Sequence, residues 1–406
     1  QKALVVGGGI AGMTAALGIA DHGFSVDLLE KSEALGGNLQ ALHRTIQGDS
    51  PQELLEETIS KVEKHPNIHL YNNSEGNPGR FFTTIEKEDG TGETLEHGIT
   101  ILATGGSEAK TESYGYGETD AILTQRELEE RLAAGSLDPM GLKCVAMIQC
   151  VDSREEPRNY CSRICCTSAL KNALYLKEQN PEIDIYIFYR DIMAYGFLET
   201  YYTQARRAGI IFTQYDVNKK PGVNVENGGL AISTMDPILG RELVVTPDLL
   251  VLSTGAVPHD SNELAAHFGV EINQDGFYQE AESKWRPVDF IKEGIFMAGL
   301  GHSPRSITET IATAEAAAQR ALRILNSERL ATGNIVAQVR HSLCSLCERC
   351  ITACPYGARS HDEETGQVAV RVRPYAPTAL PWFGDMGTSR CLRSLMLPLR
   401  LFFRGG

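Results

Sequence analysis

Three features are missing from this 406-residue sequence, and each absence excludes a class of protein. There is no run of eighteen uncharged apolar residues, so no segment predicts a membrane-spanning helix. There is no basic excess, because 38 Lys and Arg stand against 52 Asp and Glu and leave a net charge of −14. We therefore expect no nucleic acid partner, and membrane contact only through other proteins. The first residues show no signal-peptide pattern, which favours a soluble, cytoplasmic protein.

Cysteine is absent from the first 143 residues and then appears in clusters. Five of the ten cysteines lie between Cys144 and Cys166, four lie between Cys344 and Cys354, and Cys391 stands alone. A disulfide scaffold spreads cysteines through a small secreted domain, whereas clusters in a large intracellular chain more often hold metal. With 42% apolar and 22% charged residues, the composition is that of a globular chain of two or three domains.

The N-terminal region predicts a strand, a glycine loop, a helix over residues 13–21 and a second strand. In the loop, Gly7 allows a tight turn, Gly9 lets the backbone approach a pyrophosphate, and Gly12 permits close packing of helix on strand. Glu30 ends the second strand, where it can accept hydrogen bonds from ribose hydroxyls. A tight turn without a ligand is the alternative. The loop residues expected to bind the cofactor are Gly7, Gly9, Ile10, Ala11 and Gly12.

Further motifs resemble those of two-dinucleotide-binding-domain flavoproteins such as thioredoxin reductase and glutathione reductase. The segment from Glu30 to Gly37 resembles the loop that lies along FAD in those enzymes, so FAD is favoured over NAD. Two strand ends resemble their ATG motifs, and Gly294 to Gly299 resembles their terminal flavin motif. By this resemblance the additional FAD-binding residues are Glu30, Lys31, Gly36, Gly37, Ala103, Thr104, Gly105, Thr254, Gly255, Gly299, Ser306 and Ile307.

The terminal motif departs from that family, because Leu300 to Arg305 stands where an Asp usually follows the glycine. The resemblance implies that the helix from Ile307 points its N-terminus at the pyrimidine edge of the flavin, where a partial positive charge favours the reduced, anionic ring. His302 and Arg305 lie near this edge by sequence. A role as surface loop residues is an equal alternative for both.

The second predicted βαβ unit lacks a nicotinamide site. Its first strand, over residues 142–151, is followed by no GxGxxG and instead by Cys150, Cys161, Cys165 and Cys166. Four thiolates are enough for one iron–sulfur cluster, but the C-x10-C-x3-C-C spacing is not the common ferredoxin one. A zinc site, or buried cysteines with two free thiols, are the alternatives.

The stretch around these cysteines closely resembles the signature of the A-type subunits of heterodisulfide reductase. The residues that carry the resemblance are Ile148 to Arg154, Tyr160 to Leu174 and, with Met193 in place of the usual Arg, Tyr189 to Gly196. The resemblance implies that Cys150, Cys161, Cys165 and Cys166 hold a 4Fe–4S cluster beside FAD and that Lys171 contacts the flavin. A solvated helix lysine is the alternative for Lys171. The resemblance runs from residue 1 to about residue 360.

The C-terminal region carries a ferredoxin motif, Cys344-x2-Cys347-x2-Cys350-x3-Cys354-Pro355. In two-cluster ferredoxins the fourth cysteine serves the other cluster, yet no second run follows here. Either Cys354 completes one local cluster or the second half is altered or lost; zinc is a further alternative. Methanogen relatives carry an inserted ferredoxin and an additional N-terminal domain that are not visible here, so we expect a short-form member or a fragment.

These patterns predict an α/β fold resembling thioredoxin reductase, with two Rossmann-type domains and a ferredoxin-like module. We expect residues 1–140 and 247–326 to form the FAD-binding domain, residues 141–246 the second Rossmann-like domain, and residues 327–406 the ferredoxin-like domain. Helices are also expected over residues 51–64, 168–177, 198–208 and 307–325, and a small antiparallel sheet over residues 222–245.

The family resemblance implies an oxidoreductase subunit that uses FAD and two 4Fe–4S clusters. Its expected partners are subunits similar to heterodisulfide reductase B and C, a hydrogenase or formate dehydrogenase module, and ferredoxin, within a dimer of a larger complex. Flavin-based electron bifurcation is plausible for such a subunit. The alternatives are the related subunit that relays electrons between the quinone pool and adenylylsulfate reductase, and a structural hub whose clusters brace an interface.

Overall fold

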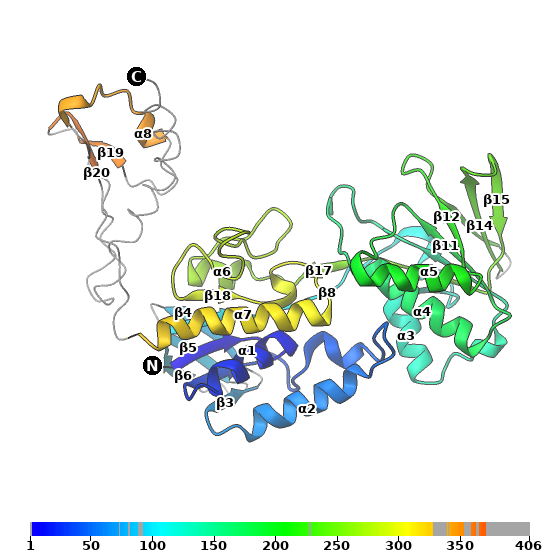
Figure 1. Cartoon of the computed structure of the whole chain (residues 1–406), viewed down its shortest axis with the longest axis horizontal. Coiled ribbons are helices and arrows are strands. Elements are labelled where there is room, and N and C mark those ends of the chain that lie inside the picture. The colour runs from blue at the N-terminus through cyan, green and yellow to red at the C-terminus, as the bar shows by residue number, and fades with distance from the viewer. Residues whose placement is uncertain are drawn as a thin grey trace. The chain divides into compact units, whose positions relative to one another are not determined.

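The chain divides into two compact units, Gln1–Leu325 and Asn326–Gly406, which are described separately (Figure 1). The computed structural model describes residues 2–72, 74–79, 82–87, 92–226, 229–327, 339, 341–352, 359–362 and 365–370. None of the helices in these ranges has the length and apolar character that crossing a bilayer requires.

The first sheet of unit 1 is a five-stranded parallel sheet that begins with the N-terminal strand. Its strand order is β18-β7-β1-β2-β3. The strands are β1 (Lys2–Val6), β2 (Ser25–Leu29), β3 (Ile68–Tyr71), β7 (Ile99–Leu102) and β18 (Ile295–Met297). β7 is buried along its whole length, as expected of a central strand with both faces covered. The sheet therefore joins the start of the chain to residues almost 300 positions later.

Helices α1 (Ile10–Ala20) and α7 (Ile307–Leu325) pack against each other beside this sheet (Figure 1). The close approach uses small residues, because a Cβ on Gly18 would lie 3.2 Å from Cβ of Ala318. α2 (Pro51–Lys64) lies next to α1. The expected bounds of α2 and α7 are confirmed. The expected start of α1 at Met13 is wrong: the helix begins at Ile10, because the low helix propensity of glycine did not prevent the glycine loop from running directly into a helical turn.

The second sheet of unit 1 is also parallel and has the strand order β12-β11-β10-β16-β9. The strands are β9 (Ile122–Thr124), β10 (Cys144–Ile148), β11 (Asp184–Tyr189), β12 (Ile211–Gln214) and β16 (Leu249–Leu252). Because side chains alternate along each strand, this sheet has two different buried faces. One face packs on helices and the other on the small antiparallel sheet.

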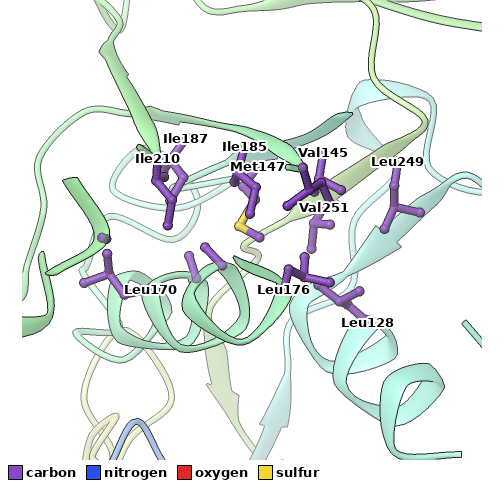
Figure 2. Close-up of a cluster of buried hydrophobic side chains, with 14 of the residues drawn as sticks. Leu128, Val145, Met147, Leu170, Leu176, Ile185, Ile187, Ile210, Leu249 and Val251 are labelled. Carbon is purple, nitrogen blue, oxygen red and sulfur yellow. The ribbon is translucent and has the colours of Figure 1, made fainter. Parts of the chain in front are cut away.

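The helix-covered face is a continuous apolar core (Figure 2). Figure 2 shows Leu170 and Leu176 of α4 (Cys165–Gln179) facing the strands, with Leu176 on the side of Val145 and Leu170 on the side of Ile187. α4 thus runs antiparallel to the strands, and its N-terminus lies at their carboxyl ends. The expected start of this helix at Ser168 is wrong, because it begins three residues earlier and includes Cys165 and Cys166 in its first turn.

The remaining elements of unit 1 connect or cover the two parallel sheets. Two antiparallel sheets, β4-β5-β6 and β13-β14-β15, each follow the third strand of a parallel sheet along the chain, and the second confirms the expected sheet over residues 222–245. A two-stranded ribbon, β8 with β17, joins the halves. The bounds are β4 (Ser74–Gly79), β5 (Phe82–Lys87), β6 (Gly92–Glu96), β8 (Gly106–Glu108), β13 (Gly222–Glu226), β14 (Gly229–Asp236), β15 (Arg241–Val245), β17 (Ala256–Pro258), α3 (Gln125–Ala133), α5 (Glu199–Arg207) and α6 (Asn262–Phe268).

Unit 2 is described over short ranges only. It contains a helix, α8 (Arg349–Thr352), and an antiparallel pair of strands, β19 (Arg359–Asp362) and β20 (Gln367–Val370). The expected cluster ligand Cys354, the following Pro355 and the tail with Cys391 lie outside the described residues.

Candidate functional site

The glycine loop between β1 and α1 separates three structural demands. A Cβ on Gly7, whose φ is +110°, would lie 2.2 Å from the carbonyl oxygen of Ala103, and a Cβ on Gly12 would lie 1.8 Å from that of Gly7. These two glycines are required by the fold itself. Gly9 is different, because it has an ordinary φ of −72° and its Cβ would meet nothing within 4 Å. The open space beside Gly9, at the N-terminus of α1, fits a pyrophosphate.

The loop that follows the second strand lies against this glycine loop. The Gly36 N–H donates to the carbonyl of Gly8 at 2.9 Å. Glu30 accepts hydrogen bonds from the backbone N–H of Gly8 at 2.6 Å and of Ser32 at 2.8 Å. Each carboxylate oxygen retains a second lone pair, so Glu30 can still accept from ribose hydroxyls. Its carboxylate also fixes the two loops to each other.

The other expected FAD-binding motifs converge on this site in part. Ala103 touches Gly7, and a Cβ on Gly299 would lie 2.8 Å from Cβ of Ala11. Thr254 and Gly255, in contrast, follow β16 of the second sheet, and a Cβ on Gly255 would lie 2.6 Å from Oγ of Ser162. The Thr254 hydroxyl is buried without a hydrogen-bond partner. This second motif therefore stands beside the cysteine-rich segment.

The start of α7 is a compact polar cluster. Ser306 and Glu309 cap the helix reciprocally: the Ser306 N–H donates to Glu309 at 3.0 Å, and the Glu309 N–H donates to the Ser306 hydroxyl at 3.2 Å. His302 is buried between Arg305, 2.6 Å away, and Glu280, 3.2 Å away. Burial and the adjacent Arg305 lower the pKa of His302, which favours a neutral imidazole. The interpretation of His302 as a surface loop residue is therefore wrong.

The segment from Cys150 to Cys166, which we call the cysteine loop, has an unusual backbone. Seven non-glycine residues have positive φ in the described part of the chain, and six of them belong to the two cysteine-rich segments. They are Cys150, Asp152, Arg154, Arg163, Leu346 and Glu348. Residues in this region of φ/ψ space are strained and cluster at functional sites. The strain marks both cysteine segments as built for something other than packing.

The four thiols of the cysteine loop lie near one another at the carboxyl ends of the second sheet. Burial raises the pKa of Cys150 and of Cys166, the latter to about 12, and each is raised further by the other cysteines. Burial and the same neighbours also raise the pKa of Cys165. Arg154 opposes the rise at Cys150. The backbone N–H of Arg163 donates to the Cys161 sulfur at 3.3 Å. A metal would convert these protonated thiols to thiolates.

No three His, Cys, Asp or Glu side chains in the described ranges gather closely enough for a single metal ion. A 4Fe–4S cube makes a different demand, since each of its thiolates binds a separate iron atom. The cysteine loop fits such a group in one further respect. Buried polar atoms at its rim, including Nη1 of Arg154 and both side-chain atoms of Gln149, have no hydrogen-bond partner. Buried donors of this kind normally have partners, and cluster sulfur atoms would accept from them.

Arg163 connects the cysteine loop to the start of α7. Its guanidinium donates to the carbonyl oxygen of Pro304 at 3.0 Å and pairs with Glu309 at 3.3 Å. The Tyr195 hydroxyl, which follows β11, accepts from Arg163 at 3.2 Å. Tyr160, also in the loop, donates to the carbonyl of Ala256 at 2.9 Å. The structure thus brings the expected cluster ligands next to the helix end expected at the flavin.

Lys171 is buried in α4, with 7% of its side chain exposed. Its ammonium donates to Oε2 of Glu129 at 2.5 Å and to the carbonyl of Arg44 at 3.1 Å. The other oxygen of Glu129 accepts from the backbone N–H groups of His43 and Arg44. The interpretation of Lys171 as a solvated helix lysine is therefore wrong, while its contact with flavin stays a prediction. Sequence reasoning missed Glu129, because an acid in an amphipathic helix gives no signal of its partner.

The described C-terminal cysteines also carry signs of ligand geometry. Leu346 and Glu348, on either side of Cys347, have φ of +56°. Hydrogen bonds from the backbone of Arg349 and from Ser345 lower the pKa of Cys347. Cys344 and Cys350 are partly exposed. N–H groups turned toward sulfur favour the thiolate, which is the form that binds metal.

Comparison with known proteins gives two family matches within the chain. Residues 5–56 match an NAD(P)-binding Rossmann-like domain, and residues 337–360 match a 4Fe-4S binding domain. An iron-sulfur A subunit of CoB–CoM heterodisulfide reductase from Methanopyrus kandleri, the one numbered 2, is 31% identical, over 91% of this chain and 71% of that protein. The A subunit of the H2:CoB-CoM heterodisulfide,ferredoxin reductase of Methanothermobacter marburgensis is 30% identical over the same shares.

Solved structures confirm the expected fold class. Thioredoxin reductase of T. acidophilum matches with a TM-score of 0.57 and 18% identity, over 80% of this chain and 98% of that one. The thioredoxin reductase of Lactococcus lactis matches with a TM-score of 0.56 and the same identity, over 80% of this chain and 99% of that one. In this chain the fold consists of two parallel sheets, each followed by an antiparallel sheet.

We predict opposite consequences for two alanine substitutions in the glycine loop. Gly9→Ala should leave the melting temperature of the flavin-free chain unchanged and reduce bound flavin at least tenfold, because the new methyl enters open space needed by the pyrophosphate. Gly12→Ala should prevent stable folding, because its methyl overlaps a carbonyl. Flavin absorbance per chain and thermal unfolding measure both effects. Normal flavin content in Gly9→Ala would contradict the assigned pyrophosphate position.

A second prediction concerns the buried pair of Lys171 and Glu129. Lys171→Met should lower the free energy of unfolding by about 3 kcal/mol, because it leaves a buried carboxylate without its cation. Adding Glu129→Gln should recover at least half of that loss, since no buried charge remains. Unfolding of the two single variants and the double variant measures this coupling. Additive effects of the two changes would show that the pair is not closed in solution.

Proposed function

Because the chain belongs to the family of heterodisulfide reductase A subunits, we propose that it transfers electrons between FAD and a 4Fe–4S cluster held by the cysteine loop. It is an oxidoreductase subunit of the iron–sulfur flavoprotein type. The observation that carries the proposal is the contact of Arg163 with Pro304 and Glu309. That contact holds the four thiols beside the helix end where the flavin ring is expected.

The proposed FAD site is formed by residues 1–140 and 247–326. When bound, FAD exchanges electrons in pairs and the clusters exchange them singly. Gly9 and the N-terminus of α1 would receive the pyrophosphate, and Glu30 the ribose. The start of α7 would place its positive helix end at the flavin ring, with His302 and Arg305 close by. Lys171, on α4, would add a second positive charge near this ring.

The proposed cluster site occupies the place where related reductases bind nicotinamide. The carboxyl ends of β10 and β16 and the N-terminus of α4 form the crevice that ligands use in such sheets. Here Cys150, Cys161, Cys165 and Cys166 fill that crevice. Cys344, Cys347, Cys350 and Cys354 would hold a second cluster in residues 327–406. The chain thus offers two exits for single electrons.

The finer proposal is electron bifurcation within a cytoplasmic complex. Of each electron pair received by FAD, one electron would go to ferredoxin and the other to a heterodisulfide-type acceptor of higher potential. Subunits similar to heterodisulfide reductase B and C and a hydrogenase or formate dehydrogenase module would be the partners. Relatives named as heterodisulfide,ferredoxin reductase subunits support this proposal. A simple relay between quinone and adenylylsulfate reductase is the competing function.

Iron content tests the two proposed clusters. The anaerobically purified chain should contain about eight iron atoms with equal sulfide. Cys161→Ser and Cys347→Ser should each remove about four of them, from different clusters. Cys144→Ser is the matched control, because Cys144 lies at the opposite end of β10, and it should remove none. Zinc in place of iron, or full iron in Cys161→Ser, would refute the cluster assignment.

A reductive titration of the bound flavin distinguishes bifurcation from relay. Bifurcation requires the second electron to leave FAD at a much lower potential than the first, so no one-electron flavin signal should accumulate in electron paramagnetic resonance spectra at any potential. A relay predicts a stable one-electron signal between two separated potentials. A strong signal would therefore favour the relay function.

A further inference from the structure

Two buried polar side chains without partners point to a hydrogen-bonding role toward the cluster. We propose that Gln149 and Ser253 donate hydrogen bonds to sulfur atoms of the cluster held by the cysteine loop and raise its reduction potential. This inference rests on the proposed function, because it needs the cluster at that place. It adds two positioning residues that are not ligands.

Both side chains are fully enclosed. Gln149 has 0% and Ser253 has 2% of its surface exposed. Nevertheless Nε2 and Oε1 of Gln149 and Oγ of Ser253 make no hydrogen bond to any described residue. A native protein rarely leaves three such atoms unsatisfied at one place, because their desolvation is not compensated. Their partner is therefore a group that the chain itself does not supply.

Backbone pairing places the two residues side by side. The Ser253 N–H donates to the carbonyl of Ile148, and the Val151 N–H donates to the carbonyl of Ser253. Gln149 continues β10 in the same way, since its N–H donates to the carbonyl of Phe188. The ladder thus extends past the ends of β10 and β16, and the alternation of side chains extends with it.

That alternation decides which face the two side chains occupy. Met147 and Val251 belong to the apolar core under α4, as Figure 2 shows, whereas Ile148 and Leu252 belong to the opposite core. Gln149 lies two residues after Met147, and Ser253 lies two residues after Val251. Both therefore face the side of α4, at the carboxyl ends of the strands, where the N-terminus of α4 carries Cys165 and Cys166.

The chemistry at this place identifies the acceptor. Cys150 follows Gln149 directly, and α4 begins with two further cysteines, so sulfur is the acceptor in reach. The Gln149 amide N–H and the Ser253 hydroxyl are donors. Hydrogen bonds to sulfur favour the form of the cluster that has gained an electron, so they raise its reduction potential.

Potentiometry tests this inference in the full chain carrying Cys347→Ser, so that only the cluster of the cysteine loop remains. Gln149→Leu should lower the midpoint potential by at least a tenfold change in the one-electron equilibrium constant, or about 59 mV. Ser253→Ala should lower it less. Thr234→Val is the matched control, because it removes another buried, unpartnered hydroxyl, in β14, and it should leave the potential unchanged.

Iron content and melting temperature complete the test. With normal iron and an unchanged potential in both variants, the inference would be wrong while the proposed function stands; absence of iron from the parent chain would instead refute the proposed function. Gln149→Leu should also raise the melting temperature of the iron-free chain and lower that of the loaded chain, because the amide has a partner only in the latter. A rise in both states would overturn the inference. Ser253→Ala, which removes one oxygen, serves if Gln149→Leu does not fold.

Discussion

The packing of the cysteine loop against the start of α7 is the constraint on which the rest of the site depends. Arg163 makes this contact with two acceptors, and Tyr160 adds a third attachment at Ala256. The loop can hold four thiols near the expected flavin only because both halves of unit 1 contribute to it. A loop anchored to the second sheet alone would place the same cysteines without reference to the flavin.

This constraint explains why strain collects in the loop. Cys150, Asp152, Arg154 and Arg163 all have positive φ, and the surrounding contacts hold each of them there. Asp152 accepts from the hydroxyls of Thr111 and Ser113 at 2.6 Å, and Arg154 pairs with Asp191 at 2.8 Å. Strained backbone persists only where such contacts determine it. The orphaned donors at the rim follow the same logic, since both features are costs that a bound cluster would offset.

The thioredoxin-reductase-like fold shows how a nicotinamide crevice can be given a new chemistry. The parallel sheet, the crossing helix and the antiparallel sheet of the second half are all present. The connection after β10 carries the difference, because cysteines stand there in place of a glycine turn. α4 lies over the sheet, and its N-terminus faces thiols in place of phosphates. A helix N-terminus favours either kind of anion, so the fold accommodates the exchange.

The sequence by itself determined the elements and the chemical types. Glycine spacing, the two cysteine clusters and the apolar periodicity of α2 and α7 are local patterns, and local patterns survive without knowledge of the fold. Only the tertiary structure decided that Lys171 meets Glu129, that Arg163 reaches Pro304, and that Gln149 and Ser253 lie together without partners. Each of these joins residues more than 40 positions apart, because strand pairing and helix packing, which no short stretch of sequence encodes, bring them together.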